Sequence, residues 1–289
     1  MIITIHKSLF TRLILYVLLT GYYSGLLARQ QEYIVYKGNN IGFFAIVNIV
    51  MGILDEFDQR RWAGVKVDLG RAGQYYDSKM GPNWWNYYFQ PLQVGKNTGR
   101  IKDNPNGDYY GIYTLCRMSR QRGHYLLNKY IKIKPFVHRL VNNFYDKNLQ
   151  GAYLIGIHYR GTDKGSEAAK VGYENAFRAV QNKINALHGK PYKIFVATDE
   201  QNFLNAIKSK FSNIYYTNSA RSTDGTPLHY AHNRSPFKQG LECLIDALLL
   251  ARCNTLIRTA SHLSNTSAMF NPNIEFISLN THYHANCPR

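Results

Sequence analysis

The chain has 289 residues, of which 45% are hydrophobic and 18% are charged, and its formal net charge is +17. This length allows one large core or two smaller ones, and the ordinary composition excludes a largely disordered chain. A positive surplus of this size attracts anions such as nucleotides, nucleic acid or an acidic membrane surface, although it also serves solubility. The basic residues form no dense block, which weakens an interpretation as a nucleic-acid-binding protein.

The N-terminal segment, residues 1–30, has two interpretations. Lys7 and Arg12 precede an apolar run from Leu13 to Ala28, as in a signal peptide or a short signal anchor. The run is interrupted by residues 21–24 and is short for a membrane span. The segment is therefore either a targeting or membrane-anchoring segment or an irregular start of the fold. The location stays open between a secretory or Golgi-type anchored protein and a bacterial-type cytoplasmic, membrane-proximal one.

The four cysteines predict neither a zinc site nor a disulfide framework. Cys116, Cys243, Cys253 and Cys287 show no CxxC pair and no Cys/His spacing typical of zinc. Cys243 and Cys253 fall in or at the end of an apolar helical stretch, where a free thiol packs as a small hydrophobe.

The first half of the chain mixes strand and helix patterns. The expected elements are, in chain order, a strand at 33–36, a buried helix at 41–57, a strand at 63–69, an aromatic ordered loop at 75–89, and helical sequence over 123–145 that Pro135 breaks or restarts.

The second half alternates strands and helices regularly. We expect strands at 152–158, 192–198, 255–258 and 275–279, and helices at 173–187, 203–211 and 240–252. Such alternation with nearly all-apolar strands predicts a parallel sheet covered on both faces. A polar stretch at Lys147–Gly151 marks the boundary, which gives an N-terminal domain at 31–148 and a C-terminal domain at 149–289.

The run from His158 to Lys164 follows the first strand of the second half. Ligands of doubly wound sheets bind beyond the carboxyl ends of the strands, so this run is a candidate site. Gly161 permits a close backbone approach, and Arg160 with Lys164 would hold a diphosphate. The alternative is a structural turn in which Asp163 neutralises Arg160.

The second polar run, Thr198 to Glu200, follows the next strand. Thr198 with Gln201 fits a capping box for the following helix. Asp199 is therefore either a helix cap or a ligand contact.

The third group begins on the helix at 240–252. Glu242 and Asp246 are four residues apart, and this like-charge pair needs partners in a helix that is apolar nearly all round. Asp246 would accept from the adjacent N–H donors of guanine, which adenine lacks; the alternative is a structural pair with an internal Arg or Lys. The hydroxyls of Thr259 and Ser261, at a strand-to-helix switch, are suited to cap the helix and to hold phosphate.

No DxD-type carboxylate pair and no HxxxH pattern accompanies these runs. Arg160, Lys164 and a helix N-terminus would then neutralise a diphosphate leaving group, which favours a metal-free mechanism.

These three blocks resemble the three motifs of the α1,2-, α1,6- and protein O-fucosyltransferase superfamily. His158 to Lys164 is similar to the first motif of the α1,6 (core and nodulation-type) branch, and Ala197 to Glu200 to the second. Asp246, the leucine-rich run after it and Thr259 to Ser261 resemble the third at matching spacing. The resemblance covers residues 152–279, and three motifs in order make it specific.

The resemblance implies a GT-B fold with two Rossmann-like domains, GDP-fucose as donor, no metal cofactor and inversion at the anomeric carbon. It implies that Arg160 binds the β-phosphate, that His158 and Asp246 flank the guanosine, that Ser261 touches phosphate and that Asp199 supports the site. The residues it places at the donor are His158, Arg160, Asp163, Asp199, Asp246, Thr259, Ser261, Gly42 and Phe43, the last two in a Gly-rich loop and helix at 38–48.

The implied catalytic residues are Arg160, Lys164 and Glu167, although Glu167 lies one residue nearer to the first motif than the family's proposed base. Trp84, Trp85 and Tyr88 have no counterpart in the better-known members. They lie in the half not assigned to the donor and are either an acceptor-side surface or a structural plug.

The function expected from the sequence is transfer of fucose or a related sugar from a GDP-sugar to a glycan, glycolipid or protein hydroxyl. The alternatives are a catalytically silent nucleotide- or sugar-binding relative and a basic nucleic-acid-binding protein, for which no known module is present. Asn265 begins a glycosylation sequon inside the third motif, and in a lumenal protein it would have to stay unmodified.

Overall fold

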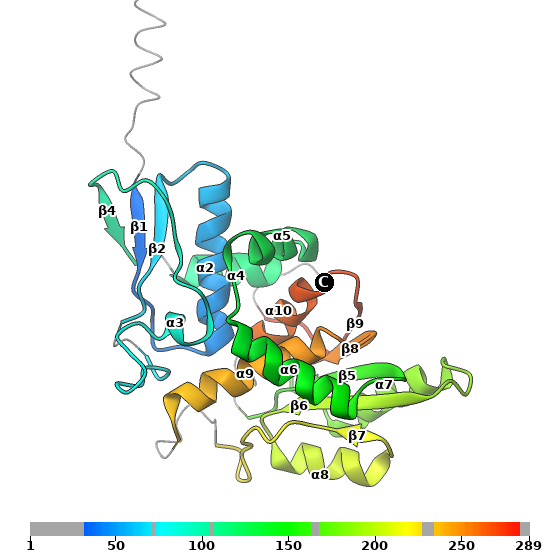
Figure 1. Ribbon diagram of the computed structural model, residues 1–289. Coiled ribbons are helices and arrows are strands. Elements are labelled where there is room, and N and C mark those ends of the chain that lie inside the picture. Colours follow the sequence, from blue (N-terminus) through cyan, green and yellow to red (C-terminus); the bar gives the residue numbers. More distant parts are fainter. Residues whose placement is uncertain (1–31, 71–72, 105–106, 163–167, 227–233, 284–289) are drawn as a thin grey trace, which may run out of the picture.

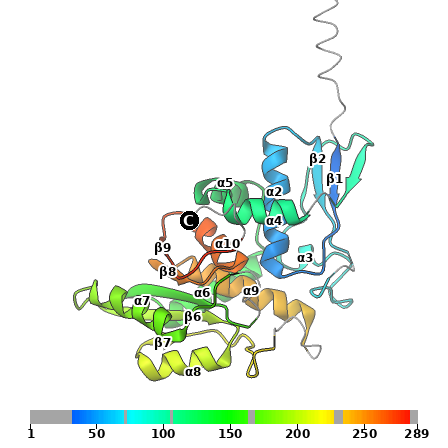
Figure 2. The same cartoon turned by 180° about the vertical axis from the view of Figure 1, so that it is seen from behind.

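The structure is a computed structural model that describes residues 32–70, 73–104, 107–162, 168–226 and 234–283. Its strands form two separate sheets, and a group of helices that includes α2, α5, α9 and α10 lies between them (Figures 1 and 2). The fold is therefore α/β, as predicted.

The first sheet belongs to the N-terminal half and has the strand order β3-β2-β1-β4. β1 pairs in parallel with β2 and β4, whereas β3 is antiparallel to β2. The elements of this half are β1 (Tyr33–Tyr36), α2 (Phe43–Asp58), β2 (Gly64–Val67), α3 (Trp85–Tyr88), β3 (Gln93–Gly95), β4 (Ile101–Asp103), α4 (Gly107–Cys116), α5 (Arg120–Tyr130) and α6 (Pro135–Asn148).

The predicted strand at 33–36 and helix at 41–57 are confirmed, the helix as α2. Pro135 is the first residue of α6, where its missing N–H is no loss, so the predicted break there is confirmed as a restart. β3, β4 and α4 were not expected.

The second sheet is wholly parallel, with the order β7-β6-β5-β8-β9. Its elements are β5 (Tyr153–Tyr159), α7 (Tyr173–Asn185), β6 (Tyr192–Thr198), α8 (Gln201–Lys210), β7 (Ile214–Tyr215), α9 (Pro236–Leu250), β8 (Thr255–Arg258), α10 (His262–Phe270) and β9 (Glu275–Ser278). The prediction of a parallel sheet in this half is confirmed.

Alternate side chains of the second sheet enter two different cores, because successive residues of a strand point to opposite faces. Leu154 and Leu256 join the core shared with α9 and α10, whereas Ile155 and Ile257 join the core under α7 and α8. The first core continues into the N-terminal half, so the division at residues 148 and 149 stays a prediction.

The aromatic segment at 75–89 is packed into the core and contains the short helix α3. Trp84, Trp85 and Tyr88 are each 0% exposed. The Trp85 indole donates to the Gln90 carbonyl over 3.2 Å, and the Tyr88 hydroxyl donates to the Phe237 carbonyl over 2.8 Å. These rings therefore form a structural plug and not an acceptor-side surface, because side chains without exposed surface offer nothing for a sugar acceptor to stack on.

The expectation of no disulfide is wrong, because Cys116 is disulfide-bonded, whereas Cys243 and Cys253 carry free thiols. Sequence spacing could not indicate this, since a disulfide depends on proximity in the fold. Among the described residues, no helix combines the length and the apolar character that crossing a bilayer needs.

Candidate functional site

The three motifs meet at Arg160, directly after β5. The Arg160 amide donates to the Thr259 hydroxyl over 2.9 Å, so the third motif holds the backbone of the first. The side chain of Arg160 is 32% exposed and its Nε lies 3.9 Å from an Asp199 carboxylate oxygen. The guanidinium is thus positioned by the protein and still accessible to an anion.

Asp199 fixes the turn that follows Arg160. Its carboxylate accepts from the Gly161 amide over 3.1 Å and from the Thr162 hydroxyl over 2.7 Å. Asp199 is therefore not a helix cap, and the capping-box interpretation of Thr198 is wrong. The Thr198 hydroxyl accepts from the Glu200 amide over 3.2 Å, and Glu200 itself is the N-cap of α8, without a capping side-chain bond.

Glu200 ends the second motif and was given no role of its own from the sequence, yet it packs against the same turn. Its carboxylate accepts from the Tyr173 hydroxyl over 2.8 Å. A Cβ at Gly161 would meet this carboxylate, so a larger residue there would displace the end of the Glu200 side chain. The turn after β5 is thus fixed from several directions.

His158 lies two residues before Arg160 and on the same face of the sheet. It is paired in register with Ala197 on β6 and with Arg258 on β8, and it is 5% exposed. Its predicted place at the carboxyl edge is confirmed, while its contact with guanosine stays a prediction.

Asp246 is buried on α9 and lies beside the segment that follows β7. The Thr217 hydroxyl donates to Asp246 Oδ1 over 2.6 Å. Burial raises the pKa of Asp246 to about 6, against the opposing effects of the Thr217 hydrogen bond and the Arg221 charge. The Arg221 guanidinium donates to the carbonyls of Ser219 and Thr217, and its charge acts on the Asp246 carboxylate.

The two carboxylates of α9, Glu242 and Asp246, have different hydrogen-bond partners. Glu242 forms an ion pair with Arg234, accepts a hydrogen bond from the Ala220 amide and lies 3.9 Å from the Lys238 ammonium. Among the described residues the hydrogen-bond partners of the two carboxylates thus differ, whereas the Arg221 charge acts on both. Thr217 and Arg221 were missed by the sequence analysis, because the two-residue strand before them gave no periodic signal.

The hydroxyls of the third motif are bonded within the protein. Ser261 is the N-cap of α10 and accepts from the Leu263 amide over 3.2 Å. The capping role foreseen for the hydroxyls is confirmed for Ser261, and its phosphate contact stays a prediction. Asn265, the residue of the sequon, is 9% exposed and its amide donates to the Thr114 carbonyl at 3.4 Å, so a glycan has no room there in the folded protein.

Gly42 and Phe43 lie at the start of α2, where Gly42 is the N-cap. The Phe43 amide donates to the Tyr75 hydroxyl over 2.8 Å, so this amide is already used. Burial raises the pKa of Tyr75 overall, although the charge of Arg160 acts to lower it. The start of α2 thus lies close to the first motif, as the donor assignment requires.

Asp163, Lys164 and Glu167 lie outside the described residues, so their predicted roles stay predictions. Within the residues that the structure describes, no group of three or more His, Cys, Asp or Glu side chains is arranged to hold a metal ion.

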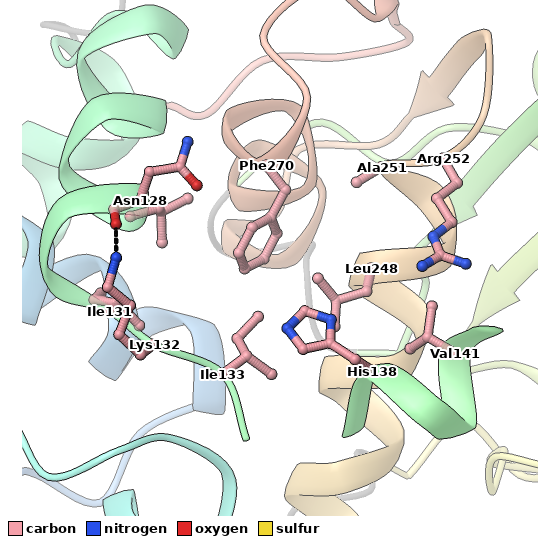
Figure 3. A pocket seen from close by; sticks show the side chains of 11 residues that line it. Asn128, Ile131, Lys132, Ile133, His138, Val141, Leu248, Ala251, Arg252 and Phe270 are labelled. Atoms are coloured by element: carbon pink, nitrogen blue, oxygen red, sulfur yellow. Dashed lines mark hydrogen bonds between the residues drawn. The ribbon is translucent and has the colours of Figure 1, made fainter. Parts of the chain in front are cut away.

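A pocket lies elsewhere, between α5, α6, α9 and α10 (Figure 3). Its α9 residues directly precede β8, so it lies toward the amino edge of the sheet, away from Arg160. Its lining includes Leu248 of the leucine-rich run after Asp246 but none of the polar residues of the three motifs. The lining residues are Leu127, Asn128, Ile131, Lys132, Ile133, His138, Val141, Leu248, Ala251, Arg252 and Phe270.

The family model of nodulation protein Z (NodZ) matches residues 113–282, more than half of the chain. The chain belongs to the nodulation protein Z family. The nodulation protein Z of Bradyrhizobium diazoefficiens is 28% identical over 161 residues, which cover 52% of this chain and 43% of that relative. The protein of Sinorhizobium fredii is 24% identical over 200 residues, 61% of each chain. The chain thus spans 43% to 61% of the length of these two NodZ relatives.

Solved structures show the same fold. A NodZ α1,6-fucosyltransferase soaked with GDP-fucose matches with a TM-score of 0.61 at 15% identity, over 84% of this chain and 94% of that one. FUT1 of Arabidopsis thaliana in complex with GDP matches with a TM-score of 0.51 at 12% identity, over 85% and 70%. The predicted GT-B-like fold and the predicted kinship with fucosyltransferases near NodZ are thereby confirmed.

Proposed function

We propose that this NodZ-family chain is a GDP-fucose-dependent glycosyltransferase. The observation that carries the proposal is the convergence of three separated motifs on Arg160, an accessible guanidinium at the carboxyl end of a parallel strand. Such a fixed fork suits two oxygens of one phosphate. Crystals of the related NodZ enzyme were soaked with GDP-fucose, and the enzyme was co-crystallised with GDP, which supports the same donor here.

Asp246 would select guanine. A carboxylate accepts from the N1–H and the exocyclic amino group of guanine, and adenine presents no such pair of adjacent donors. Thr217 donates to one oxygen of buried Asp246, and Ser219 and the Arg221 charge also act on this carboxylate, yet burial still raises its pKa. A guanine base would supply further donors.

In the transfer step, the bond between the anomeric carbon and the β-phosphate oxygen breaks while an acceptor hydroxyl attacks from the opposite side. Negative charge then grows on the phosphate, and Arg160, aided by Lys164 and the N-terminus of α10, would stabilise it. This arrangement calls for no metal cofactor and inverts the anomeric carbon. Glu167 is the proposed base that takes the proton of the acceptor hydroxyl.

The acceptor is proposed to be a hydroxyl of a glycan, glycolipid or protein. For the location, we propose an oxidising compartment, with residues 1–30 as a targeting or anchoring segment. The disulfide of Cys116 supports this, because disulfides persist where glutathione and thioredoxin do not reduce them. The buried sequon at Asn265 is compatible with such a compartment. Thiol labelling of freshly extracted protein tests it: labelling of Cys116 without prior reduction would contradict the proposal.

The function is tested by incubating the protein with GDP-fucose, GDP-mannose and UDP-galactose and measuring the nucleoside diphosphate released. Candidate acceptors are added in a second series. We expect release from GDP-fucose above the other donors and a further rise with the correct acceptor. Binding of GDP without release from any GDP-sugar, with or without acceptors, would contradict catalysis.

A further inference from the structure

Arg258, the last residue of β8, is a partly buried cation that no part of the proposed site has yet used. Its guanidinium makes no hydrogen bond and no ion pair with any described residue, and its Nε is buried without a partner among them. Among the described residues, its only cation–π contact is with the ring of Phe276, whose centroid lies 4.8 Å from the guanidinium carbon. Burial lowers the pKa of Arg258 to about 10, and no carboxylate among the described residues offsets this.

Such an arrangement is energetically unfavourable in the unliganded protein. A buried arginine normally has a carboxylate partner, because the loss of hydration otherwise exceeds what a ring contact returns. A ligand anion is the partner that would complete the site.

The sheet register aligns Arg258 with the first motif. Arg258 is paired with His158, so the two side chains leave the same face of neighbouring parallel strands, and Arg160 leaves that face two residues further on. Thr259, the next residue after Arg258, is the one that holds the Arg160 amide. Arg258 and Arg160 thus start from the ends of neighbouring strands on one face of the sheet. The Arg258 guanidinium lies over Phe276 of β9, on the side away from β5, and Arg120 lies over the same ring, so the Arg258 side chain would turn from β9 toward β5 to contact an anion beside Arg160.

The order of the strands indicates which anion lies there. Thr217 and Asp246, the proposed guanine site, lie after β7, and the sheet then continues through β6 and β5 to β8. A nucleotide with its base at Asp246 would extend along this edge toward Arg160, and its terminal phosphate would come to lie between β5 and β8.

We propose that Arg258 is a donor-binding residue that contacts the β-phosphate of the GDP-sugar from the β8 side, opposite Arg160. The proposal rests on the proposed function and adds to it a residue that none of the three motifs includes. It explains why the protein maintains an unpaired arginine at this position.

The test compares the binding of GDP and GMP to the wild type and to Arg258→Met by calorimetry, together with the thermal unfolding temperature. GMP lacks the β-phosphate, so a contact with that group affects only GDP. We expect Arg258→Met to weaken GDP roughly 10- to 100-fold, the usual range for one charge-assisted hydrogen-bonded contact. We expect GMP binding unchanged and an unfolding temperature no lower than that of the wild type, since the unpaired charge is gone.

Arg258→Lys keeps the charge without the planar fork and should fall between wild type and Arg258→Met. Arg178→Gln on α7 is the matched control, since it removes an exposed arginine from the other face of the sheet and should change neither ligand. Wild-type affinity for GDP in Arg258→Met would overturn the proposal. So would an equal loss of GDP and GMP with a lowered unfolding temperature, which would make Arg258 structural. If the wild type itself bound no GDP, the proposed function would be overturned, and this outcome is distinguished from failure of the Arg258 proposal because it does not depend on any variant.

Discussion

The backbone amide of Arg160 and the hydroxyl of Thr259 are joined by a 2.9 Å hydrogen bond across 99 residues of sequence. Because this bond fixes the strand end from which the guanidinium projects, the position of the proposed phosphate ligand depends on a residue of another motif. Thr259 is thus a positioning residue that acts through Arg160.

We expect Thr259→Val to reduce kcat about 10-fold or more while KM for the donor changes less. Valine has the same shape, but it removes the acceptor of the part-buried Arg160 amide, which costs roughly 1 to 3 kcal/mol. Initial-rate kinetics measure the effect, and Thr259→Ser, which restores the hydroxyl, should recover most of kcat. Equal kcat in the valine and serine variants would exclude the positioning role.

Asp246 predicts a pH dependence of stability. Its pKa is about 6 in the folded protein, above the ordinary 3.8, so the folded state binds a proton that the unfolded state has already lost between these values. The unfolding free energy of the wild type should therefore fall, as pH rises from 4 to 6, by up to about 3 kcal/mol relative to Asp246→Asn. Urea unfolding of both proteins at pH 4, 6 and 8 measures this. A constant difference between them would contradict the raised pKa.

The same carboxylate predicts a pH-dependent choice of base. Guanine binding requires ionised Asp246, so the ratio of GDP to ADP affinity should fall about 10-fold between pH 7 and pH 5. The ratio cancels the titration of the phosphates, which both nucleotides share. In Asp246→Asn the ratio should be lower and independent of pH. A wild-type protein that binds ADP and GDP equally at pH 7 would remove the guanine assignment.

The buried rings of the aromatic segment predict a structural effect. Trp85→Ala should lower the unfolding free energy by about 3 to 5 kcal/mol, the usual range for a large aromatic deleted from a core. GDP affinity at low temperature should change little as long as the protein stays folded. Tyr76→Ala, a partly buried neighbour, is the control and should cost less. Stable folding of Trp85→Ala with a raised acceptor KM would instead restore the acceptor-side interpretation.

Metal independence is a prediction of its own. Cationic side chains and a helix N-terminus are proposed to neutralise the leaving group, so turnover should survive an excess of EDTA. Dialysis against the chelator, followed by assay with and without added manganese or magnesium, checks it. A loss of turnover that either ion restores would mean that a metal takes part.

The sequence predicts the C-terminal half well because its pattern is strong. Four apolar strands separated by helices indicate a parallel sheet, and all four are observed close to their predicted positions. β3 and β4 were not predicted because each has only three residues, mostly exposed, which is too short to show an alternating hydrophobic pattern. β7 was not predicted because it has only two residues, and the contact of Thr217 with Asp246 after it was not predicted either.

The candidate site was found by position, since polar residues after parallel strands stand out in sequence. Their partnerships were not found, because a hydrogen bond between Arg160 and Thr259, or the close approach of Glu200 to Gly161, depends on register. The disulfide of Cys116 belongs to the same class of long-range information. The fate of Trp84 could not be decided either, because a large aromatic in a loop suits a sugar surface and a core equally.

The central claim is that this chain cleaves GDP-fucose through Arg160, and paired donor kinetics test it most directly. GDP release from GDP-fucose is measured for the wild type, Arg160→Lys and Arg160→Ala, with Arg139→Ala as a control on the exposed side of α6. We predict wild-type rates for the control, a kcat lowered on the order of 100-fold or more in Arg160→Lys, and almost none left in Arg160→Ala. Near-normal release by a folded Arg160→Ala protein would contradict the account.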